Sequence, residues 1–306
     1  MTRPPTNISA SVRARLAQHA RARGHDFQLV LTRYANERLL YRLATSTHAD
    51  RFILKGAALF TLWVGQPHRA TRDLDLLGFG DAGEEHLRDV FVEVLGRSMP
   101  EDGVAFDVDV LEVGPIRDDQ EYGGVRVSTV ARIAGAKVRV QVDIGFGDAV
   151  TPDAELVDFP ALLDFPAPRL LAYPRETVVA EKLDAMVQLG MANSRMKDFF
   201  DVAMLADRFT FAGALLARAI RATFERRRTT LPRGVPVALS SEFADDAAKR
   251  TQWAAFVRKA GAAGTADLPT TVERIANFVS RPLEVATTNG PWDGRWANGG
   301  PWSSHP

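Results

Sequence analysis

The chain has 306 residues, and its 38 Lys and Arg residues balance its 38 Asp and Glu residues, so its formal net charge is zero. This balance excludes a polybasic protein that binds nucleic acid through net charge alone. Hydrophobic residues make up 46% and charged residues 25% of the sequence, which is typical of a chain with a packed core and excludes disorder over most of its length.

The sequence carries no pattern for export or membrane insertion. It contains no Cys, which excludes disulfides, thiolate metal ligands and cysteine nucleophiles. The N-terminal residues lack the apolar segment of a secretory signal, and no stretch reaches the roughly 18 uninterrupted apolar residues of a membrane span. We therefore expect a cytoplasmic protein that has no membrane partner.

The charged residues are distributed unevenly along the chain. Residues 1–51 contain nine Arg and three acidic residues, residues 210–235 contain six Arg and one Glu, and residues 81–121 contain thirteen acidic residues and three Arg. Blocks of like charge are commonly solvated faces. The two basic blocks could instead form a surface for a polyanionic partner such as RNA, and the sequence leaves both interpretations open.

Hydrophobic periodicity predicts two helices followed by a mixed sheet. Helical periodicity covers residues 9–22 and 27–44, with Ser9 or Ser11 as the N-cap of the first helix and Gly24 at its end. From residue 51 the pattern alternates between strands and helices. The predicted strands cover residues 52–54, 70–79, 104–111, 125–133, 137–144 and 170–173, and the predicted helices cover residues 57–64 and 84–96.

The C-terminal half is predicted to be helical, over residues 174–189, 194–207, 212–227, 242–260 and 270–279. We therefore predict an α+β chain with a helical N-terminal layer (residues 1–50), a mixed-sheet core (51–170) and a helical C-terminal domain (171–285). Residues 286–306 are rich in Gly and Pro and lack periodicity, which predicts a flexible tail. The three Trp residues of this segment make docking to a partner the alternative.

Two acidic residues, Asp73 and Asp75, lie on one predicted strand. Side chains alternate across a strand, so both carboxylates should emerge on the same face as Thr71. Adjacent carboxylates require a compensating cation, and Mg²⁺ prefers oxygen ligands that it can share with phosphate. The alternative is an exposed strand with acidic positions that face solvent.

Two neighbouring segments strengthen the interpretation as a metal and phosphate site. Asp143 lies on the polar face of the alternating strand VRVQVDIGF, and three carboxylates on adjacent strands fit two-metal nucleotidyl transfer. Lys55 and Gly56 lie where a predicted strand meets a helix, so backbone N–H groups and the ammonium could bind a phosphate. Taken singly, these features are also compatible with a solvated strand end and a simple turn.

The helical half contributes further candidates. Lys182 lies on a predicted helix, and its compact ammonium suits a contact with a triphosphate. Arg195, Lys197, Asp198 and Asp201 follow within one or two turns of the next helix. Ordinary surface ion pairs between residues three or four positions apart are the alternative explanation for both groups.

Taken in order, these segments resemble the AbiEii/AbiGii nucleotidyltransferase toxins of bacterial toxin–antitoxin (type IV) and abortive-infection systems, including MenT-like enzymes. The resemblance covers roughly residues 28–207 and depends on the ordered set. It is carried by RFILKGAALFTLW, RATRDLDLL, VQVDIGFGD, VVAEKLDAMVQLG and SRMKDFFDVAML.

The resemblance implies a polymerase-β-like nucleotidyltransferase core, an α+β fold, with a metal-dependent site. In this family pattern Thr71 and Asp73 occupy the Thr/Ser-x-Asp positions, and Lys182 would bind the triphosphate. Together with the carboxylates described above, we expect Asp73, Asp75 and Asp143 to bind Mg²⁺. Asp198 would be the late essential aspartate. The residues implied in nucleotide binding are Lys55, Gly56, Thr71, Lys182, Arg195 and Lys197. Gly-Ser after the first strand is the family pattern, but here Gly56 is followed by Ala, so phosphate contact is left to backbone N–H groups and Lys55.

The implied activity is transfer of a nucleotide, often a pyrimidine nucleotide, from NTP to the 3′ acceptor end of tRNA, which blocks translation. The implied partners are NTP, tRNA and a cognate antitoxin. One alternative acceptor is a small molecule or a protein hydroxyl, including Thr71 of the chain itself. A second alternative is a nucleotide-binding module without turnover.

Overall fold

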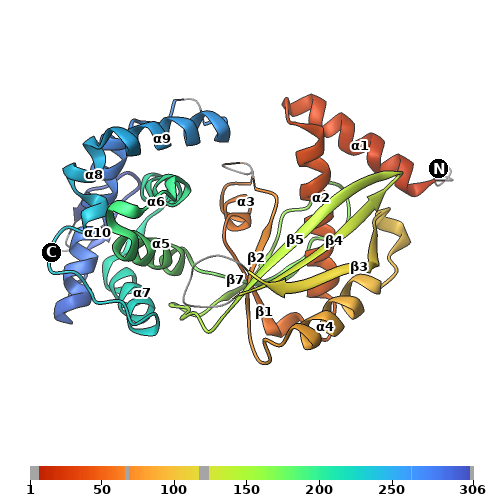
Figure 1. Cartoon of the computed structure of the whole chain (residues 1–306), viewed down its shortest axis with the longest axis horizontal. Helices are drawn as coiled ribbons and strands as arrows, with labels where there is room; N and C mark the ends of the chain where they lie inside the picture. Colours follow the sequence, from red (N-terminus) through yellow and green to blue (C-terminus); the bar gives the residue numbers. More distant parts are fainter. Residues whose placement is uncertain (1–6, 66–68, 70, 117–123, 263, 304–306) are drawn as a thin grey trace. The chain divides into compact units, whose positions relative to one another are not determined.

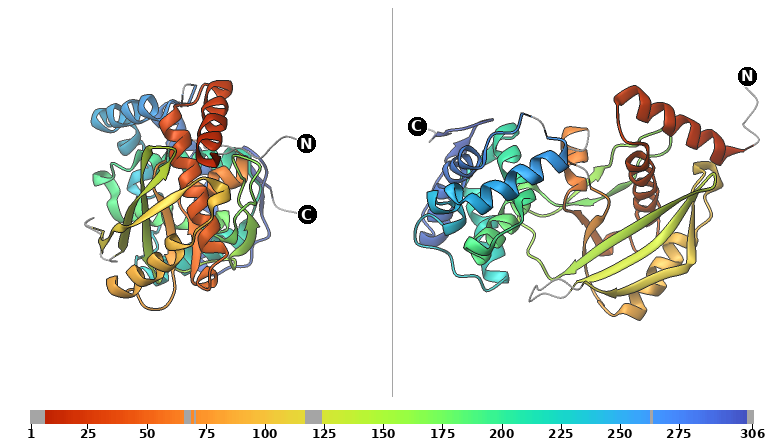
Figure 2. Two further views of the ribbon diagram at one scale, coloured as in Figure 1. Left: turned by 90° about the vertical axis from the view of Figure 1, so that its right-hand side faces the viewer. Right: turned by 45° about the horizontal axis from the view of Figure 1, so that its top comes forward.

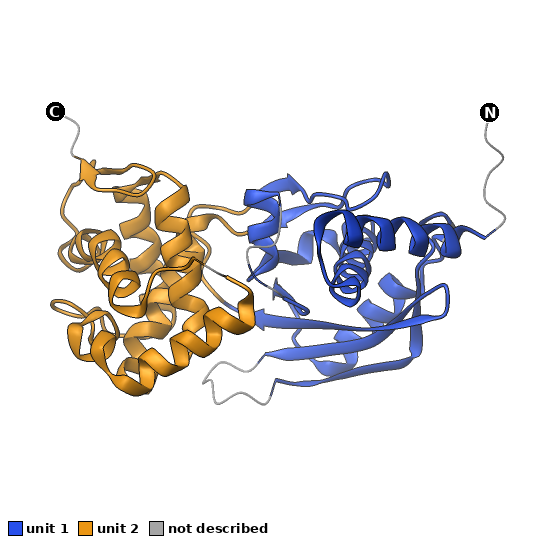
Figure 3. Cartoon of the chain, turned by 90° about the horizontal axis from the view of Figure 1, so that it is seen from above, with its two compact units in different colours: residues 1–147, 155–172 blue, residues 148–154, 173–306 orange. Residues whose placement is uncertain are grey.

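The structure is a computed structural model of the chain, and it describes residues 7–65, 69, 71–116, 124–262 and 264–303. The chain forms two compact units (Figure 3). The first unit comprises residues 1–147 and 155–172, and the second comprises residues 148–154 and 173–306. The first unit holds a mixed sheet with packed helices and the second is mainly helical, which confirms the predicted α+β class.

The described residues of the first unit form a seven-stranded sheet with the order β3-β4-β5-β2-β1-β7-β6 (Figure 1). Strand β2 pairs antiparallel with β1 and parallel with β5, and β1 pairs parallel with β7. The strands are β1 (Phe52–Lys55), β2 (Leu74–Gly78), β3 (Ala105–Pro115), β4 (Val125–Ile133), β5 (Ala136–Phe146), β6 (Glu155–Asp158) and β7 (Arg169–Ala172). Strand β2 begins at Leu74, whereas the prediction began at residue 70, so Asp73 and Thr71 precede the strand.

A two-residue turn sets the register of the β4–β5 hairpin. Ala134 and Gly135 both have positive φ (46° and 80°), as a type I′ turn requires. Alternate residues of β5 are buried, as expected for a strand that is covered on one face. These residues are Val138, Val140, Val142 and Ile144. The opposite face of β5 therefore carries its polar side chains, including Asp143.

The helices of the first unit are α1 (Ile8–Arg23), α2 (Phe27–Ala44), α3 (Ala58–Val64) and α4 (Glu84–Gly96), with short 3₁₀ turns η1 (Ala49–Arg51) and η2 (Pro100–Asp102). Helix α2 packs against β5 and β7, α4 packs against β3, and α1 lies beside α2 (Figure 2). Gly24 ends α1 in the left-handed conformation as predicted. The predicted N-cap is wrong: Asn7, and neither Ser9 nor Ser11, caps α1 by accepting a hydrogen bond from the backbone N–H of Ala10.

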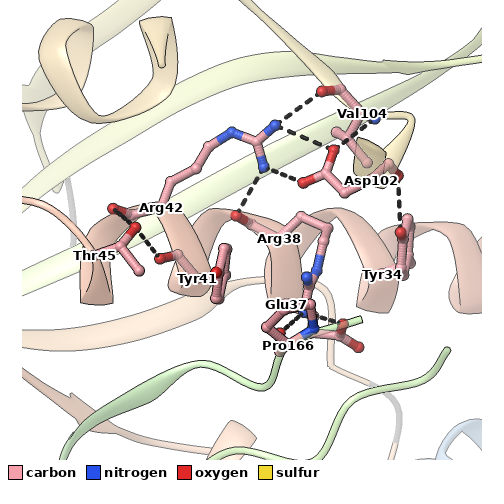
Figure 4. Close-up of polar contacts among 9 residues, drawn as sticks. All are labelled: Tyr34, Glu37, Arg38, Tyr41, Arg42, Thr45, Asp102, Val104 and Pro166. Carbon is pink, nitrogen blue, oxygen red and sulfur yellow. Dashed lines mark hydrogen bonds and ion pairs between the residues drawn. The ribbon is translucent and has the colours of Figure 1, made fainter. Parts of the chain in front are cut away.

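The middle of α2 carries buried charged residues (Figure 4). Glu37, Arg38 and Arg42 are each only 1% exposed. Arg42 donates hydrogen bonds to both carboxylate oxygens of Asp102, at 2.7 and 3.3 Å, and Arg38 pairs with Glu37 at 2.6 Å. Burial raises the pKa of Glu37, although the Arg38 guanidinium opposes this rise. Two arginines of the N-terminal basic block therefore belong to the interior of the first unit.

The second unit has the predicted helices with shifted ends. Its helices are α5 (Arg175–Leu189), α6 (Met196–Arg208), α7 (Gly213–Arg226), α8 (Ser241–Asp245), α9 (Ala247–Ala260) and α10 (Leu268–Thr288), with 3₁₀ turns η3 (Gly190–Ala192) and η4 (Val237–Leu239). The predicted helix 242–260 is divided at Asp246, whose carboxylate caps α9. No helix in the described part of the chain is long and apolar enough to cross a membrane.

The expectation of a flexible tail over residues 286–306 is wrong for the part that the structure describes, which ends at residue 303. Helix α10 continues past Pro282 to Thr288, and β9 (Arg295–Trp296) joins β8 (Phe211–Ala212) and β10 (Trp302–Ser303) in a small sheet. The indole N–H of Trp296 donates to the Ala206 carbonyl at 2.7 Å, and the indole N–H of Trp302 donates to the Phe278 carbonyl at 2.8 Å. The tryptophans pack against α6 and α10, because burying their large rings outweighs the low periodicity of the segment.

Replacing Arg42 by Met should lower the free energy of unfolding by about 3–5 kcal/mol, because the carboxylate of Asp102 would stay buried without its partner. Urea denaturation followed by circular dichroism measures this loss. The matched control is Arg15→Met, which removes a solvent-exposed pair with Asp164 and should cost less than about 1 kcal/mol. Equally small losses for both variants would contradict a structural role for the buried pair.

Replacing Trp296 by Ala should lower the free energy of unfolding of the second unit by about 3–5 kcal/mol, because the ring is 3% exposed and its removal leaves a cavity. The control, Asn298→Ala, changes an exposed residue of the same segment and should be nearly neutral. The same denaturation measurement applies. A mobile tail would instead make both substitutions neutral.

Candidate active site

Gly56 lies where β1 ends, and its lack of a side chain makes room for a carboxylate. Its φ of +69° favours glycine, and a Cβ built on it would lie 2.5 Å from Cγ of Asp75. Lys55 is opposite Asp75 in the antiparallel register of β1 and β2. The Lys-Gly break predicted from the sequence is therefore the turn against which the Asp75 carboxylate packs.

Asp75 and Asp143 are direct neighbours across the parallel pair β2–β5. Neighbouring residues in register project to the same face of a sheet, so the two side chains share the face opposite the buried valines. Asp75 is half-buried, whereas Asp73 is exposed and lies one residue before β2 begins. The structure thus brings Asp75, Asp143 and Gly56 together, and it leaves Asp73 outside strand β2.

Arg126 of β4 binds the carboxylate of Asp143 with two hydrogen bonds. Its Nε donates to Oδ1 at 2.7 Å and its Nη2 donates to Oδ2 at 2.8 Å, which is a bidentate charge-assisted pair. The amide of Gln141 lies 3.4 Å from Oδ1 of the same carboxylate. Asp143 is therefore fixed in orientation by its own sheet.

The segment that leads into β2 is tied to α2. The side-chain amide of Asn36 donates to the carbonyl of Arg72 at 2.9 Å. The hydroxyl of Thr71 lies 3.3 Å from the carbonyl of Asp73, to which it donates a hydrogen bond. The position of Asp73 thus depends on a contact with a helix about 36 residues earlier in the chain.

The carboxylates of Asp73 and Asp75 are the candidate ligands for a divalent cation at this site. Among the residues that the structure describes, no three His, Asp or Glu side chains lie close enough together to hold a metal. Both oxygens of Asp143 already accept hydrogen bonds from Arg126. The carboxylates of Asp73 and Asp75 are of the type that Mg²⁺ prefers, so they fit an ion that completes its coordination with phosphate and water.

The second unit contains a buried ion cluster between α5 and α6. The ammonium of Lys182 lies 2.6 Å from Asp198 and 2.9 Å from Asp201, and both aspartates are at most 1% exposed. The guanidinium of Arg195 contacts the other oxygen of Asp198 at 2.8 Å. Lys182, Asp198 and Arg195 therefore lie together, whereas Lys197 is exposed on α6.

A second cluster in this unit is centred on Arg227. Its guanidinium contacts three carboxylates, those of Asp148 at 3.0 Å, Asp184 at 3.2 Å and Glu181 at 3.5 Å. Burial lowers the pKa of Arg227, but the carboxylates outweigh this effect and raise it above its ordinary value. Burial, assisted by Glu181, raises the pKa of Tyr173 beside this cluster. This arginine of the second basic block thus pairs with carboxylates within the helical unit and does not contribute to an exposed basic surface.

Sequence analysis did not single out Arg126, Asn36 or Arg227 as site residues. The first could have been found, because the turn at Ala134 and Gly135 pairs Ile133 with Ala136, and counting back along the hairpin places Arg126 opposite Asp143. Asn36 lies on α2 and Arg227 directly follows α7, and the docking of both helices depends on tertiary packing. Their partners could not be assigned from residue spacing alone.

Comparisons with known proteins give a family model and similar solved structures. The family model described as "Nucleotidyl transferase AbiEii toxin, Type IV TA system" matches residues 38–277. A crystal structure from H. pylori described as a "putative nucleotidyltransferase" is 14% identical, with a TM-score of 0.51, over 87% of this chain and 99% of that chain. JHP933 from Helicobacter pylori is 13% identical, with a TM-score of 0.48, over 86% of this chain and 95% of that chain.

The first of these structures has the same nucleotidyltransferase fold as this chain, and at 14% identity the likeness shows the fold alone. A comparison with curated proteins gives no match. The family model, by contrast, covers well over half of the chain and both clusters of site residues. This protein therefore belongs to the AbiEii family of nucleotidyltransferase toxins of type IV toxin–antitoxin systems.

Proposed function

We propose that this toxin transfers a nucleotide, with a pyrimidine nucleotide as the preferred donor, from NTP to the 3′ acceptor end of tRNA in a Mg²⁺-dependent reaction in the cytoplasm. The observation that carries the proposal is the placement of Asp75 against Gly56 and beside Asp143. Transfer to the acceptor end blocks aminoacylation, and a cognate antitoxin is the expected partner in the cell.

In the proposed reaction, the 3′ oxygen of the acceptor forms a bond to the α-phosphorus of the NTP. The bond to the β-phosphate breaks, pyrophosphate leaves, and the hydroxyl proton passes to solvent. Mg²⁺ bound by Asp73 and Asp75 would polarise the phosphate and favour the deprotonated hydroxyl. Asp143, held by Arg126, would orient the hydroxyl, and Lys55 would add positive charge beside the phosphates.

The roles proposed for Lys182, Arg195, Lys197 and Asp198 rest on the family resemblance. Lys182 would contact the triphosphate and would have to exchange part of its contact with Asp198 and Asp201 to do so. Arg195 and Lys197 would shape the nucleotide site. Asp198 would hold Lys182 in place, since their contact at 2.6 Å is the shorter of the two carboxylate contacts.

Support for an RNA partner comes from α1 in the first unit. An open groove along this helix is lined by Arg13 and Arg21 with alanines between them. Both arginines are exposed, and exposed guanidinium groups spaced along a helix suit contacts with a phosphate backbone. The second basic block supports this partner less, because Arg227 is in the buried cluster and Arg221 donates to the Ala286 carbonyl at 2.9 Å.

Purified toxin should transfer label from at least one NTP to total tRNA, and Asp75→Asn should lower the rate by on the order of 100-fold or more, because a direct metal ligand is lost. The matched control, Asp89→Asn, changes an exposed carboxylate of α4 and should leave the rate unchanged. Label found in the protein rather than in RNA would favour modification of a protein hydroxyl. Label in neither, with wild-type toxin and Mg²⁺ present, would overturn the proposal.

Replacing Arg13, Arg21 and Arg23 of α1 together by Gln should weaken tRNA binding and reduce its salt dependence by about three counterions. The measurement is tRNA affinity as a function of salt concentration. The control replaces three exposed arginines of the second unit, Arg208, Arg218 and Arg258, by Gln. An equal loss of affinity in both triple variants would contradict a specific surface on α1.

A further inference from the structure

Four charged side chains form a row across the sheet of the first unit. Strands β4, β5, β2 and β1 are consecutive neighbours in this sheet. Arg126 lies opposite Asp143, which lies beside Asp75 on the next strand. Lys55 lies opposite Asp75. Residues in register on neighbouring strands project to the same face, so these four residues form a charge row with two carboxylates in its middle and one cation at each end.

The charge row is balanced by the chain itself. Two adjacent carboxylates repel each other unless positive charge lies nearby. Arg126 and Lys55 supply two positive charges for Asp143 and Asp75, so the row as a whole has no net charge. The repulsion between the carboxylates therefore does not by itself require a pair of divalent ions here.

The carboxylate of Asp143 has little capacity left for a metal ion. An ionised carboxylate offers about four acceptor positions. Arg126 donates to Oδ1 at 2.7 Å and to Oδ2 at 2.8 Å, and the amide of Gln141 lies 3.4 Å from Oδ1. A position on Oδ2 remains, and it suits a hydroxyl, which donates a proton. A cation there would lie beside the guanidinium of Arg126 and be repelled by it.

The three aspartates of the site also do not converge. In a two-metal site, ions about 3.5–4 Å apart are clamped by shared ligands. Asp73 precedes β2, whereas Asp75 and Asp143 lie within neighbouring strands. In the part of the chain that the structure describes, no three His, Asp or Glu side chains are close enough together to hold a metal. The geometry thus separates Asp143 from a metal site made of the other two.

We infer that Arg126 takes the place of a second metal ion in this toxin: it keeps Asp143 out of the metal coordination, and the site binds one divalent cation through Asp73 and Asp75. This inference rests on the proposed function and deepens it. It differs from the expectation drawn from the sequence, in which Asp143 also binds Mg²⁺. Arg126 is a positioning residue, because it reserves the Asp143 carboxylate for the hydroxyl of the acceptor.

The first test counts metal ions with Mn²⁺ as the probe for Mg²⁺. Electron paramagnetic resonance of free Mn²⁺ gives the number of ions bound per chain and their affinity. Wild-type toxin should bind one ion at this site, and Asp75→Asn should weaken it by about 10-fold or more, because a ligand is lost. Asp143→Asn should leave the affinity unchanged within about twofold, because this carboxylate is no ligand.

The second test removes the guanidinium. Arg126→Gln should add a second bound ion, because it frees the carboxylate of Asp143. Combining Arg126→Gln with Asp143→Asn should return the count to one. The matched control is Arg132→Gln, which removes another guanidinium of β4 that pairs with Asp107 and should keep the count at one.

Four results would each overturn the inference: a second ion in wild type that depends on Asp143, a loss of affinity of about 10-fold in Asp143→Asn, an unchanged count in Arg126→Gln, or no Mn²⁺ bound to wild type. If Arg126→Gln fails to fold, Asp143→Asn still decides. The titrations need neither NTP nor RNA. One ion in a toxin that labels no RNA upholds the inference while the proposed function fails, and two ions in a toxin that labels tRNA do the reverse.

Discussion

The candidate site depends on one steric constraint, the absence of a side chain at Gly56. Because of it, the carboxylate of Asp75 can lie against the turn that ends β1. The pairing of β2 with β1 on one side and β5 on the other then places Lys55 and Asp143 next to that carboxylate. Any Cβ at this position would push Asp75 away and separate these groups, so the arrangement of charges follows from the backbone of one residue.

A net charge of zero conceals how differently the charged residues are used. Some arginines of the basic blocks are interior parts, such as Arg42 with Asp102 and Arg227 with three carboxylates. Others are exposed on α1. A buried ion pair contributes little to the free energy of unfolding, but removal of one partner lowers that free energy strongly. Such pairs therefore favour the one packing of the helices in which both partners meet. Counting charges along the sequence cannot separate these two uses, because burial is a property of the fold.

Local patterns predicted the elements better than the contacts between them. The strict alternation of β5 and the apolar spacing of α4 predicted the first and last residues of these elements to within two residues. Each of these patterns is contained in one element and does not depend on tertiary contacts. The ends of α10 and the C-terminal segment were predicted wrongly, because tryptophan packing and not periodicity orders them. In the site, Gly56 and Asp75 were assigned from the sequence to the same nucleotide and metal site, although α3 separates the strands β1 and β2 along the chain. The contact of Asn36 with Arg72 requires the docking of α2 and was not foreseen.

The path of the chain between β5 and β6 limits how this protein can be divided. Residues 148–154 leave the sheet, join the helical unit, and then return to the sheet as β6. In that excursion Asp148 binds Arg227, and the backbone of Thr151 exchanges two hydrogen bonds of 2.9 Å with the hydroxyl of Thr177. A fragment that starts at residue 173 would therefore leave Arg227 and Thr177 without these partners. The helical unit is formed by two separate segments of the chain, so neither gene fusion nor truncation could move it as one uninterrupted segment.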